Sequence, residues 1–237
     1  TLVKAVEVAA QSHDLLTDLY SKVNLALCVQ LEGNLDASAS FYHHVVDRAQ
    51  KQGYRHVLHS IRLTHGDSLL LRGYLQDALS TLQQVRLDVI GLDSLFADLQ
   101  IANVLHHLGM YEQSISQLTE LRSRIQRTNS KVINVLSLLS LANNLIAIGD
   151  LQSSKDCISE AKHGLPKRHL ISALTFRVTA NRMLMAQGEY GPAIRESILA
   201  ASIARLKKYR LFLFESWHQL LRCHLAMGHF AEAREVS

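Results

Sequence analysis

A short glycine-centred motif recurs six times along this chain, and it restricts the fold more than any other feature. In each copy an apolar stretch ends at a glycine, an apolar or aromatic residue follows two positions later, and a small residue stands five positions after the glycine. The glycines are Gly33, Gly73, Gly109, Gly149, Gly188 and Gly228, separated by 40, 36, 40, 39 and 40 residues. A fixed period of this length is the signature of a repeat protein built from supersecondary units. The spacing predicts two helices per repeat.

The motif has a direct physical meaning in a helical hairpin. Glycine has no Cβ, so at a helix end it takes the left-handed conformation that closes the helix. The residue at Gly+2 then starts the next helix, and a Ser or Ala at Gly+5 lets the two helices cross closely. The residues at Gly−7 are Ala26, Gly66, Ala102, Ala142, Asn181 and Leu221. We therefore expect a helix to stop at each glycine, with a close helix crossing beside it.

These residues resemble the tetratricopeptide repeat (TPR) over nearly the whole chain. The chain departs from that pattern in its period of 36–40 rather than about 34 residues, in the helix-ending proline, which survives only at Pro166, and in the early tryptophan, which appears only at Trp217. Longer helices with the same packing resemble divergent repeats of bacterial regulators, including the sensor region of LuxR-type activators and the repeat halves of some diguanylate cyclases. The resemblance implies an all-α fold, a right-handed superhelix of about six antiparallel helix pairs.

The apolar pattern predicts thirteen helices. They are one leading helix over 2–11 and the pairs 15–31/35–51, 55–71/75–90, 93–108/111–127, 130–148/151–164, 167–187/190–207 and 209–227/230–237. Because each pair must bury its apolar face against its neighbours, we expect residues 1–237 to form a single TPR-like domain. The chain starts at Thr1 and stops inside a helical pattern, so we interpret it as a fragment of a longer protein.

Charge and composition limit the kinds of partner that this chain is expected to bind. The formal net charge is only +4 and is spread along the chain, which is not typical of a nucleic-acid-binding surface. No apolar run of about 18 residues and no leading signal segment is evident. Cys28, Cys157 and Cys223 each lie in an apolar helical stretch, as reduced, buried cysteines do. We expect a cytoplasmic chain without direct nucleic-acid or membrane contact.

In the TPR family the first helix of each pair lines a concave groove, and the position six before each glycine faces it. Along the chain this position holds Leu27, Asp67, Asn103, Asn143, Arg182 and Arg222. Asn103 and Asn143 stand where the family's peptide-clamping asparagine often stands. The planar guanidinium groups of Arg182 and Arg222 can each donate parallel hydrogen bonds to a carboxylate or phosphate. The candidate ligand-binding residues are Asp67, Asn103, His106, Asn143, Arg182, Glu215, His218 and Arg222. The alternative is that these polar side chains only solvate the groove or pair with one another, as Arg182 or Arg222 could with Glu215.

The sequence lacks the patterns that carry catalysis or cofactor binding. Phosphate-binding glycine loops, a nucleophile elbow and zinc-protease spacing are all missing, so we expect neither enzyme activity nor a cofactor or metal. The favoured hypothesis is a sensor or scaffold region of a bacterial signalling or transcription regulator that binds an extended peptide, a protein or a small anionic effector. The alternative is a structural scaffold that docks proteins, or forms a homodimer, through its convex face or its ends.

Overall fold

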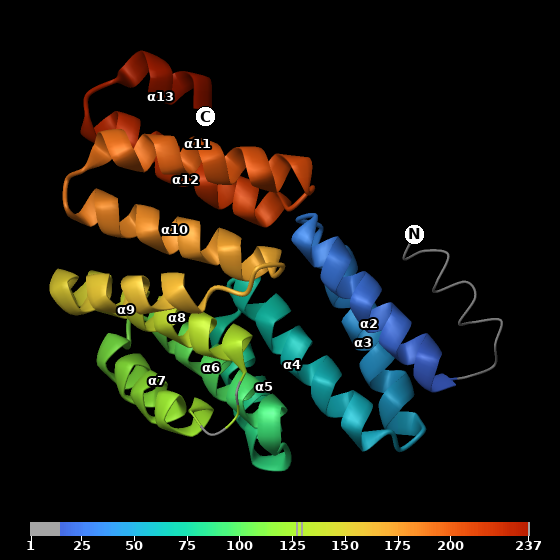
Figure 1. The fold of residues 1–237 in the computed structure, drawn as a ribbon. Helices are drawn as coiled ribbons and strands as arrows, with labels where there is room; N and C mark the ends of the chain where they lie inside the picture. The colour runs from blue at the N-terminus through green and yellow to red at the C-terminus, as the bar shows by residue number, and fades with distance from the viewer. Residues whose placement is uncertain (1–14, 127, 129, 237) are drawn as a thin grey trace. The chain divides into compact units, whose positions relative to one another are not determined.

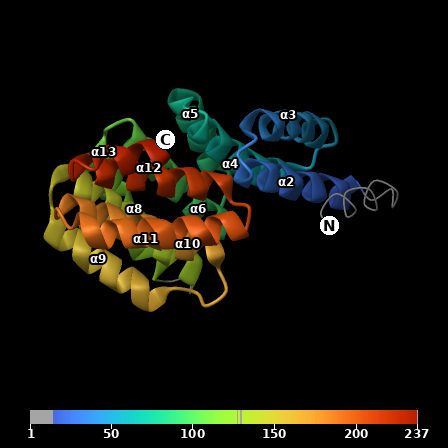
Figure 2. The same cartoon turned by 90° about the horizontal axis from the view of Figure 1, so that it is seen from above.

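The computed structural model describes residues 15–126, 128 and 130–236, except for the side chain of His56. All regular structure in that part of the chain is helical, as predicted. The expected leading helix over 2–11 lies outside the described residues, as does Ser237. Within residues 15–108, and separately within residues 109–236, helices that follow one another along the chain pack side by side and run in opposite directions (Figures 1 and 2).

Twelve helices follow one another along the described chain. They are α2 (Leu15–Leu31), α3 (Leu35–Lys51), α4 (Arg55–Leu71), α5 (Leu75–Asp88), α6 (Gly91–His107), α7 (Tyr111–Ile125), α8 (Lys131–Ile148), α9 (Leu151–Gly164), α10 (Leu170–Ala186), α11 (Tyr190–Leu206), α12 (Arg210–Ala226) and α13 (Phe230–Val236). The helices form two compact units, Thr1–Leu108 and Gly109–Ser237, called unit 1 and unit 2 below. The expectation of one domain over 1–237 stays a prediction.

The predicted helix stops are confirmed at all six glycines. Each has a positive φ, between 74° and 84°, which an L side chain rarely adopts. At the end of α2, the amide of Gly33 donates to Gln30 O at 2.8 Å and that of Asn34 donates to Val29 O at 3.1 Å. These bonds satisfy carbonyls that the end of a helix would otherwise leave unpaired.

The small residue at Gly+5 does more than permit close approach. Ser38 Oγ donates to the carbonyl of Ala26 at 3.0 Å, and Ser154 Oγ donates to the carbonyl of Ala142 at 3.1 Å. Each bond joins Gly+5 to Gly−7, across the two helices of one pair. In these two repeats the motif therefore encodes a hydrogen bond as well as a crossing.

Several helix boundaries differ by one to three residues from the sequence prediction, and two of them have a clear local reason. Helix α10 begins at Leu170 rather than 167, because His169 is its N-cap and its ring Nδ1 accepts from the amide of Ser172 at 3.2 Å. Helix α5 ends at Asp88 rather than 90, because Val89 is extended, with φ −106° and ψ 149°. A side-chain cap and one extended residue set these limits, and the apolar period alone does not encode either.

Buried apolar residues form a core within each unit. In unit 1, Leu19, Tyr42 and Ile61 centre one cluster, and Leu82 and Val104 belong to a second. In unit 2 the largest fully buried apolar side chains are Leu118, Leu121, Ile133, Leu138, Leu139 and Leu174. The interhelical faces predicted from the repeat are thus the faces that are buried.

Helix α8 corrects one expectation. It has 18 residues and a mean hydropathy of 1.6, so by length and composition alone it could cross a membrane, although the sequence was expected to hold no such stretch. It is the one helix in the described part of the chain that meets this test. Half of it is buried against the rest of the protein, as in the core helix of a globular protein.

Candidate functional site

The six Gly−6 residues all lie on the first helix of a pair, and we call this set the first-helix ladder. Its members are Leu27, Asp67, Asn103, Asn143, Arg182 and Arg222; all are half-buried except Arg222, which is exposed. Asp67 and Asn103 belong to unit 1, as does the predicted site residue His106. The other predicted site residues, Asn143, Arg182, Glu215, His218 and Arg222, belong to unit 2, and each unit is described by itself.

In unit 1 the ladder joins the first helices of two successive pairs. Gln30 on α2 donates from Nε2 to Asp67 Oδ2 on α4 at 2.8 Å. Burial raises the pKa of the Asp67 carboxyl, and the hydrogen bond from Gln30 offsets this rise only in part. Gln30 is itself 2% exposed, and its Oε1 is buried without a hydrogen-bond partner, as is the hydroxyl of Tyr42. Asp67 is therefore held in a poorly solvated setting that makes ionisation of its carboxyl less favourable than in water.

In unit 2, Asn143 on α8 makes the corresponding link to α10. Its Nδ2 donates to Thr179 Oγ1 at 3.3 Å, a long hydrogen bond between the first helices of successive pairs. The Oδ1 of Asn143 is buried and has no partner. The side-chain amide is therefore half satisfied: its nitrogen makes a hydrogen bond and its oxygen makes none within the described residues.

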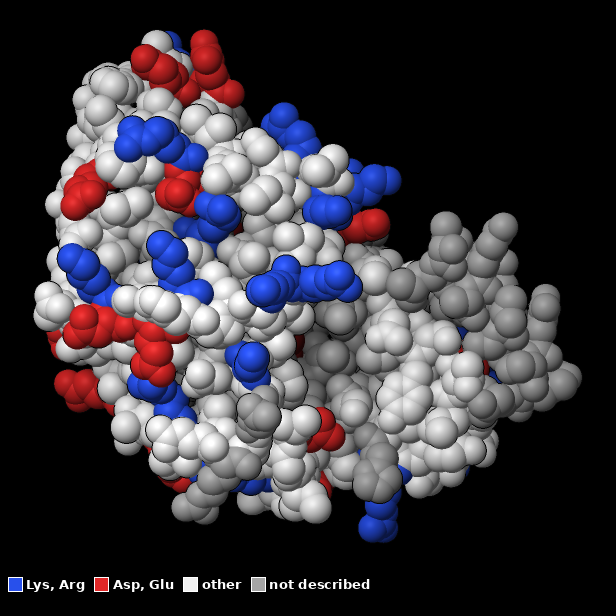
Figure 3. Space-filling model, viewed as in Figure 1, with Lys and Arg blue, Asp and Glu red and all other residues white. Residues whose placement is uncertain are grey.

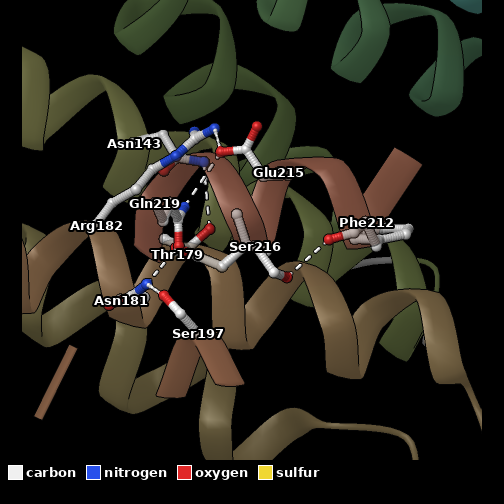
Figure 4. Close-up of polar contacts among 10 residues, drawn as sticks. Asn143, Thr179, Asn181, Arg182, Ser197, Phe212, Glu215, Ser216 and Gln219 are labelled. Carbon is white, nitrogen blue, oxygen red and sulfur yellow. Dashed lines mark hydrogen bonds and ion pairs between the residues drawn. The ribbon is translucent and has the colours of Figure 1, made fainter. Parts of the chain in front are cut away.

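Arg182 on α10 pairs with Glu215 on α12. A terminal guanidinium nitrogen of Arg182 donates to Glu215 Oε1 at 2.8 Å, and Gln219 Nε2 donates to the same oxygen at 3.2 Å (Figure 4). Burial alone would raise the pKa of Glu215, but the charge and hydrogen bond of Arg182, together with Gln219, hold it below its ordinary value. For Arg182 the structure shows the pairing that the sequence left open as the alternative to ligand binding.

The centre of the polar network in unit 2 is Asn181, which the sequence analysis did not include in the site. Asn181 is 1% exposed; its Nδ2 donates to Ser197 Oγ at 2.6 Å and to Gln219 Oε1 at 2.5 Å (Figure 4). Gln219, itself 2% exposed, donates onward to the carbonyl of Val178 at 3.2 Å. A signal was present in the sequence, because Asn181 stands at Gly−7, where the four preceding repeats have alanine or glycine.

Three further predicted residues are His106 in unit 1 and His218 and Arg222 in unit 2. His106 is half-buried on α6, and its ring lies 5.4 Å from that of His107, at 86°. His218 is exposed and stacks on Phe214, with ring centroids 6.4 Å apart. Arg222 is exposed, and no ion-pair or hydrogen-bond partner for its side chain occurs within the described residues. The structure thus joins Arg182 with Glu215 and leaves Arg222 and His218 facing solvent.

The described part of the chain contains no cluster of side chains that could form a metal centre. No group of three or more His, Cys, Asp or Glu side chains lies close enough there to hold an ion. On the face seen in Figure 3, basic and acidic side chains are interspersed and no field of one sign covers the surface.

Comparison with known proteins supports the fold. No protein-family model matches the chain, and no curated protein matches it by sequence. Among solved structures, it is similar to BtubC (BKLC) from P. vanneervenii, at 15% identity and a TM-score of 0.60, over 87% of this chain and 89% of that one. It also matches a tetratricopeptide repeat protein from Parabacteroides merdae, at 12% identity and a TM-score of 0.49, over 92% and 77%. The chain has an all-helical, TPR-like repeat fold.

Proposed function

We propose that the chain is a binding module whose first helices in unit 2, α8, α10 and α12, hold an extended peptide segment of a partner protein. TPR-like folds generally mediate protein–protein interaction, and this is the class of function that the fold supports. The observation that carries the proposal is Asn143, which is half-buried, donates to Thr179 and leaves Oδ1 without a partner. An unpaired buried acceptor is costly, and a peptide N–H would satisfy it.

The charge pattern favours a peptide over a small anion. Arg182 is already partly neutralised by Glu215, so its attraction for an anionic effector is reduced. Arg222 keeps its charge exposed on the neighbouring helix. A peptide with an acidic side chain could pair with Arg222 while its main chain bonds to Asn143, whereas a small effector would have only one of these contacts. We assign the acidic peptide as the ligand class.

Selection from a random-peptide library, followed by fluorescence-polarisation titration of the selected peptides, tests this assignment. Asn143→Ala and Arg222→Gln should each weaken binding about tenfold, which corresponds to about 1.4 kcal/mol. Arg195→Gln is a matched control, because Arg195 is exposed on the second helix α11 and should not affect affinity. Equal affinity for all three variants would exclude the first-helix face as the binding surface.

We further infer a non-catalytic, cytoplasmic role in which binding regulates another part of a bacterial signalling or transcription protein. The support is the resemblance of the repeat to such regulators, together with a polar network in which Gln219 accepts a hydrogen bond from Asn181 and donates one to Glu215. Sequencing the parent gene on both sides of this segment tests the role. A neighbouring cyclase or DNA-binding domain is the expected result, and a parent without an output domain would contradict it.

A second candidate, self-association or docking through another surface, is favoured by exposed apolar side chains on α11–α13. Leu206 is 79%, Phe214 70% and Phe230 65% exposed. Solvent-facing apolar groups of this size are typical of interaction sites when they are contiguous. Sedimentation velocity over a range of concentrations, with the variant Phe214→Ser/Phe230→Ser beside the natural chain, tests it. A monomer at every concentration would contradict self-association.

A further inference from the structure

Unit 1 contains a cavity that none of the predicted site residues lines. It has a volume of about 480 Å³ and lies between the first half of α4 and the junction of α5 with α6. The lining residues relevant to ligand binding are Arg55, Leu58 and Arg62 from α4, and Asp88, Ile90 and Asp93 from the junction of α5 with α6. Its volume falls in the range of about 300–1,000 Å³ that is typical of small-molecule and short-peptide sites.

The charges in this cavity are arranged by sign. Both arginines come from α4, whereas Asp88 is the last residue of α5 and Asp93 stands in the first turn of α6. None of these four side chains has an ion-pair or hydrogen-bond partner within the described residues, although they line one cavity. His59, which also lines it, has a buried Nδ1 without a partner. Opposite charges therefore face one space and remain too far apart to satisfy each other.

This arrangement discriminates among ligand charges. A simple anion attracted by Arg55 and Arg62 would be repelled by Asp88 and Asp93, and a simple cation would meet the reverse conflict. A ligand with one charge of each sign satisfies both walls. The lining also includes apolar residues: Leu58 is half-buried, Val89 is 7% exposed, and Ile90, at 91% exposed, stands at the open edge of the site.

We propose that this cavity binds a short zwitterionic peptide with apolar side chains and free termini. Its carboxylate lies against Arg55 and Arg62, its ammonium lies against Asp88 and Asp93, and its side chains contact Leu58 and Ile90. Carboxylate recognition by arginine is strong because the guanidinium offers parallel N–H donors. The site belongs to unit 1 and uses no residue of the first-helix face in unit 2, so it stands or falls independently of the function proposed above.

Isothermal titration calorimetry with three related probes tests the proposal. The probes are leucyl-leucine, N-acetyl-leucyl-leucine, which lacks the ammonium, and leucyl-leucine amide, which lacks the carboxylate. The free dipeptide should bind the natural chain, and each capped form should bind at least about tenfold more weakly, since a charge-assisted contact is lost. Arg62→Gln should reduce the difference in affinity between the free dipeptide and the amide, and Asp93→Asn should reduce the difference between the free dipeptide and the acetyl form, because Arg55 and Asp88 remain.

Asp77→Asn is the matched control, because Asp77 is exposed on α5 and does not line the cavity. It should leave all three affinities unchanged. Circular dichroism establishes that each variant is folded, and if a variant does not fold, the comparison of probes on the natural chain decides alone. No binding of leucyl-leucine to the natural chain, or equal affinity for the free and capped probes, would overturn the proposal.

Discussion

Arg182 and Glu215 are 33 residues apart, and they join the first helices of successive repeats through a hydrogen bond of 2.8 Å. Their side chains are 35% and 30% exposed, so solvent screens the pair in part. The same carboxylate oxygen accepts from Gln219. The pair therefore couples one edge of the buried Asn181 network to a partly solvated surface, and ligand binding at Arg182 has to compete with it.

A double-mutant cycle with Arg182→Gln and Glu215→Gln measures this coupling. Because the pair is only partly buried, we expect a coupling energy of about 0.5–1 kcal/mol, from urea denaturation of the four proteins. High salt should reduce it. Additive effects of the two substitutions would mean that the contact stabilises nothing.

The substitution Asn181→Ala tests whether stability at this position follows the residue preference of the repeat or the hydrogen bonds of the buried network. Alanine is the commonest residue at Gly−7, so the sequence pattern favours the substitution. The structure predicts the reverse, because Ser197 and Gln219 would lose their partner in a buried setting. We expect a loss of about 1–3 kcal/mol in the free energy of unfolding, measured in urea. Leu221→Ala, at the equivalent position of the next repeat, is a control that removes apolar volume without leaving polar groups unpaired. In this variant the NMR signals of the Asn181 network should be unchanged.

Gly66→Ala tests the close crossing of α4 and α5. A Cβ at Gly66 would meet Leu82 Cδ2 at 2.6 Å and Cγ at 2.7 Å, and Leu82 is fully buried. We expect destabilisation of about 1–3 kcal/mol by thermal or urea unfolding, despite the better helix propensity of alanine. In the background Leu82→Ala the same change should be neutral or stabilising, because the clash is gone. The same loss in both backgrounds would refute the crossing geometry.

The substitution Lys208→Gly tests the cost of the left-handed backbone conformation just after α11. Lys208 has φ 60°, and it is the one non-glycine residue with a positive φ in the described part of the chain. Since the left-handed conformation costs an L residue roughly 1–2 kcal/mol, glycine should stabilise the protein by about 1 kcal/mol. Lys207→Gly is the control, because Lys207 has φ −94° and should gain nothing. Differential scanning calorimetry of both variants compares them.

Stability should depend on pH with opposite signs at Asp67 and Glu215. The folded pKa of Asp67 is raised above 3.8, so its contribution to stability is fully present below that pH and is lost as pH rises through the folded pKa. Asp67→Asn should therefore lose this dependence and be the more stable form, relative to the natural chain, at neutral pH. The folded pKa of Glu215 is lowered below 4.5, so its contribution is present above that pH and is lost as pH falls through the folded pKa. Urea denaturation of Asp67→Asn and Glu215→Gln over this range measures both, and parallel curves would contradict the assigned environments.

The sequence alone determined the helical hairpins, because the features that set them are local. A glycine at a helix end closes that helix whatever lies around it, so the stops at Gly33 through Gly228 could be read directly. Apolar periodicity likewise gave the bounds of α2, α3 and α4. The local signal was insufficient where a side chain caps a helix, as His169 does at α10.

Tertiary structure decided how the polar residues are used. The sequence placed Asp67, Asn143 and Arg182 in one ladder, but their roles depend on partners about 30 to 40 residues away: Gln30, Thr179 and Glu215. The sequence analysis listed Asn181 only among the Gly−7 residues, whereas burial and its hydrogen bonds make it the centre of a network. Whether an amide or a charge is open to a ligand or already bonded depends on distances between helices and on exclusion of water, and residue spacing along the chain contains neither.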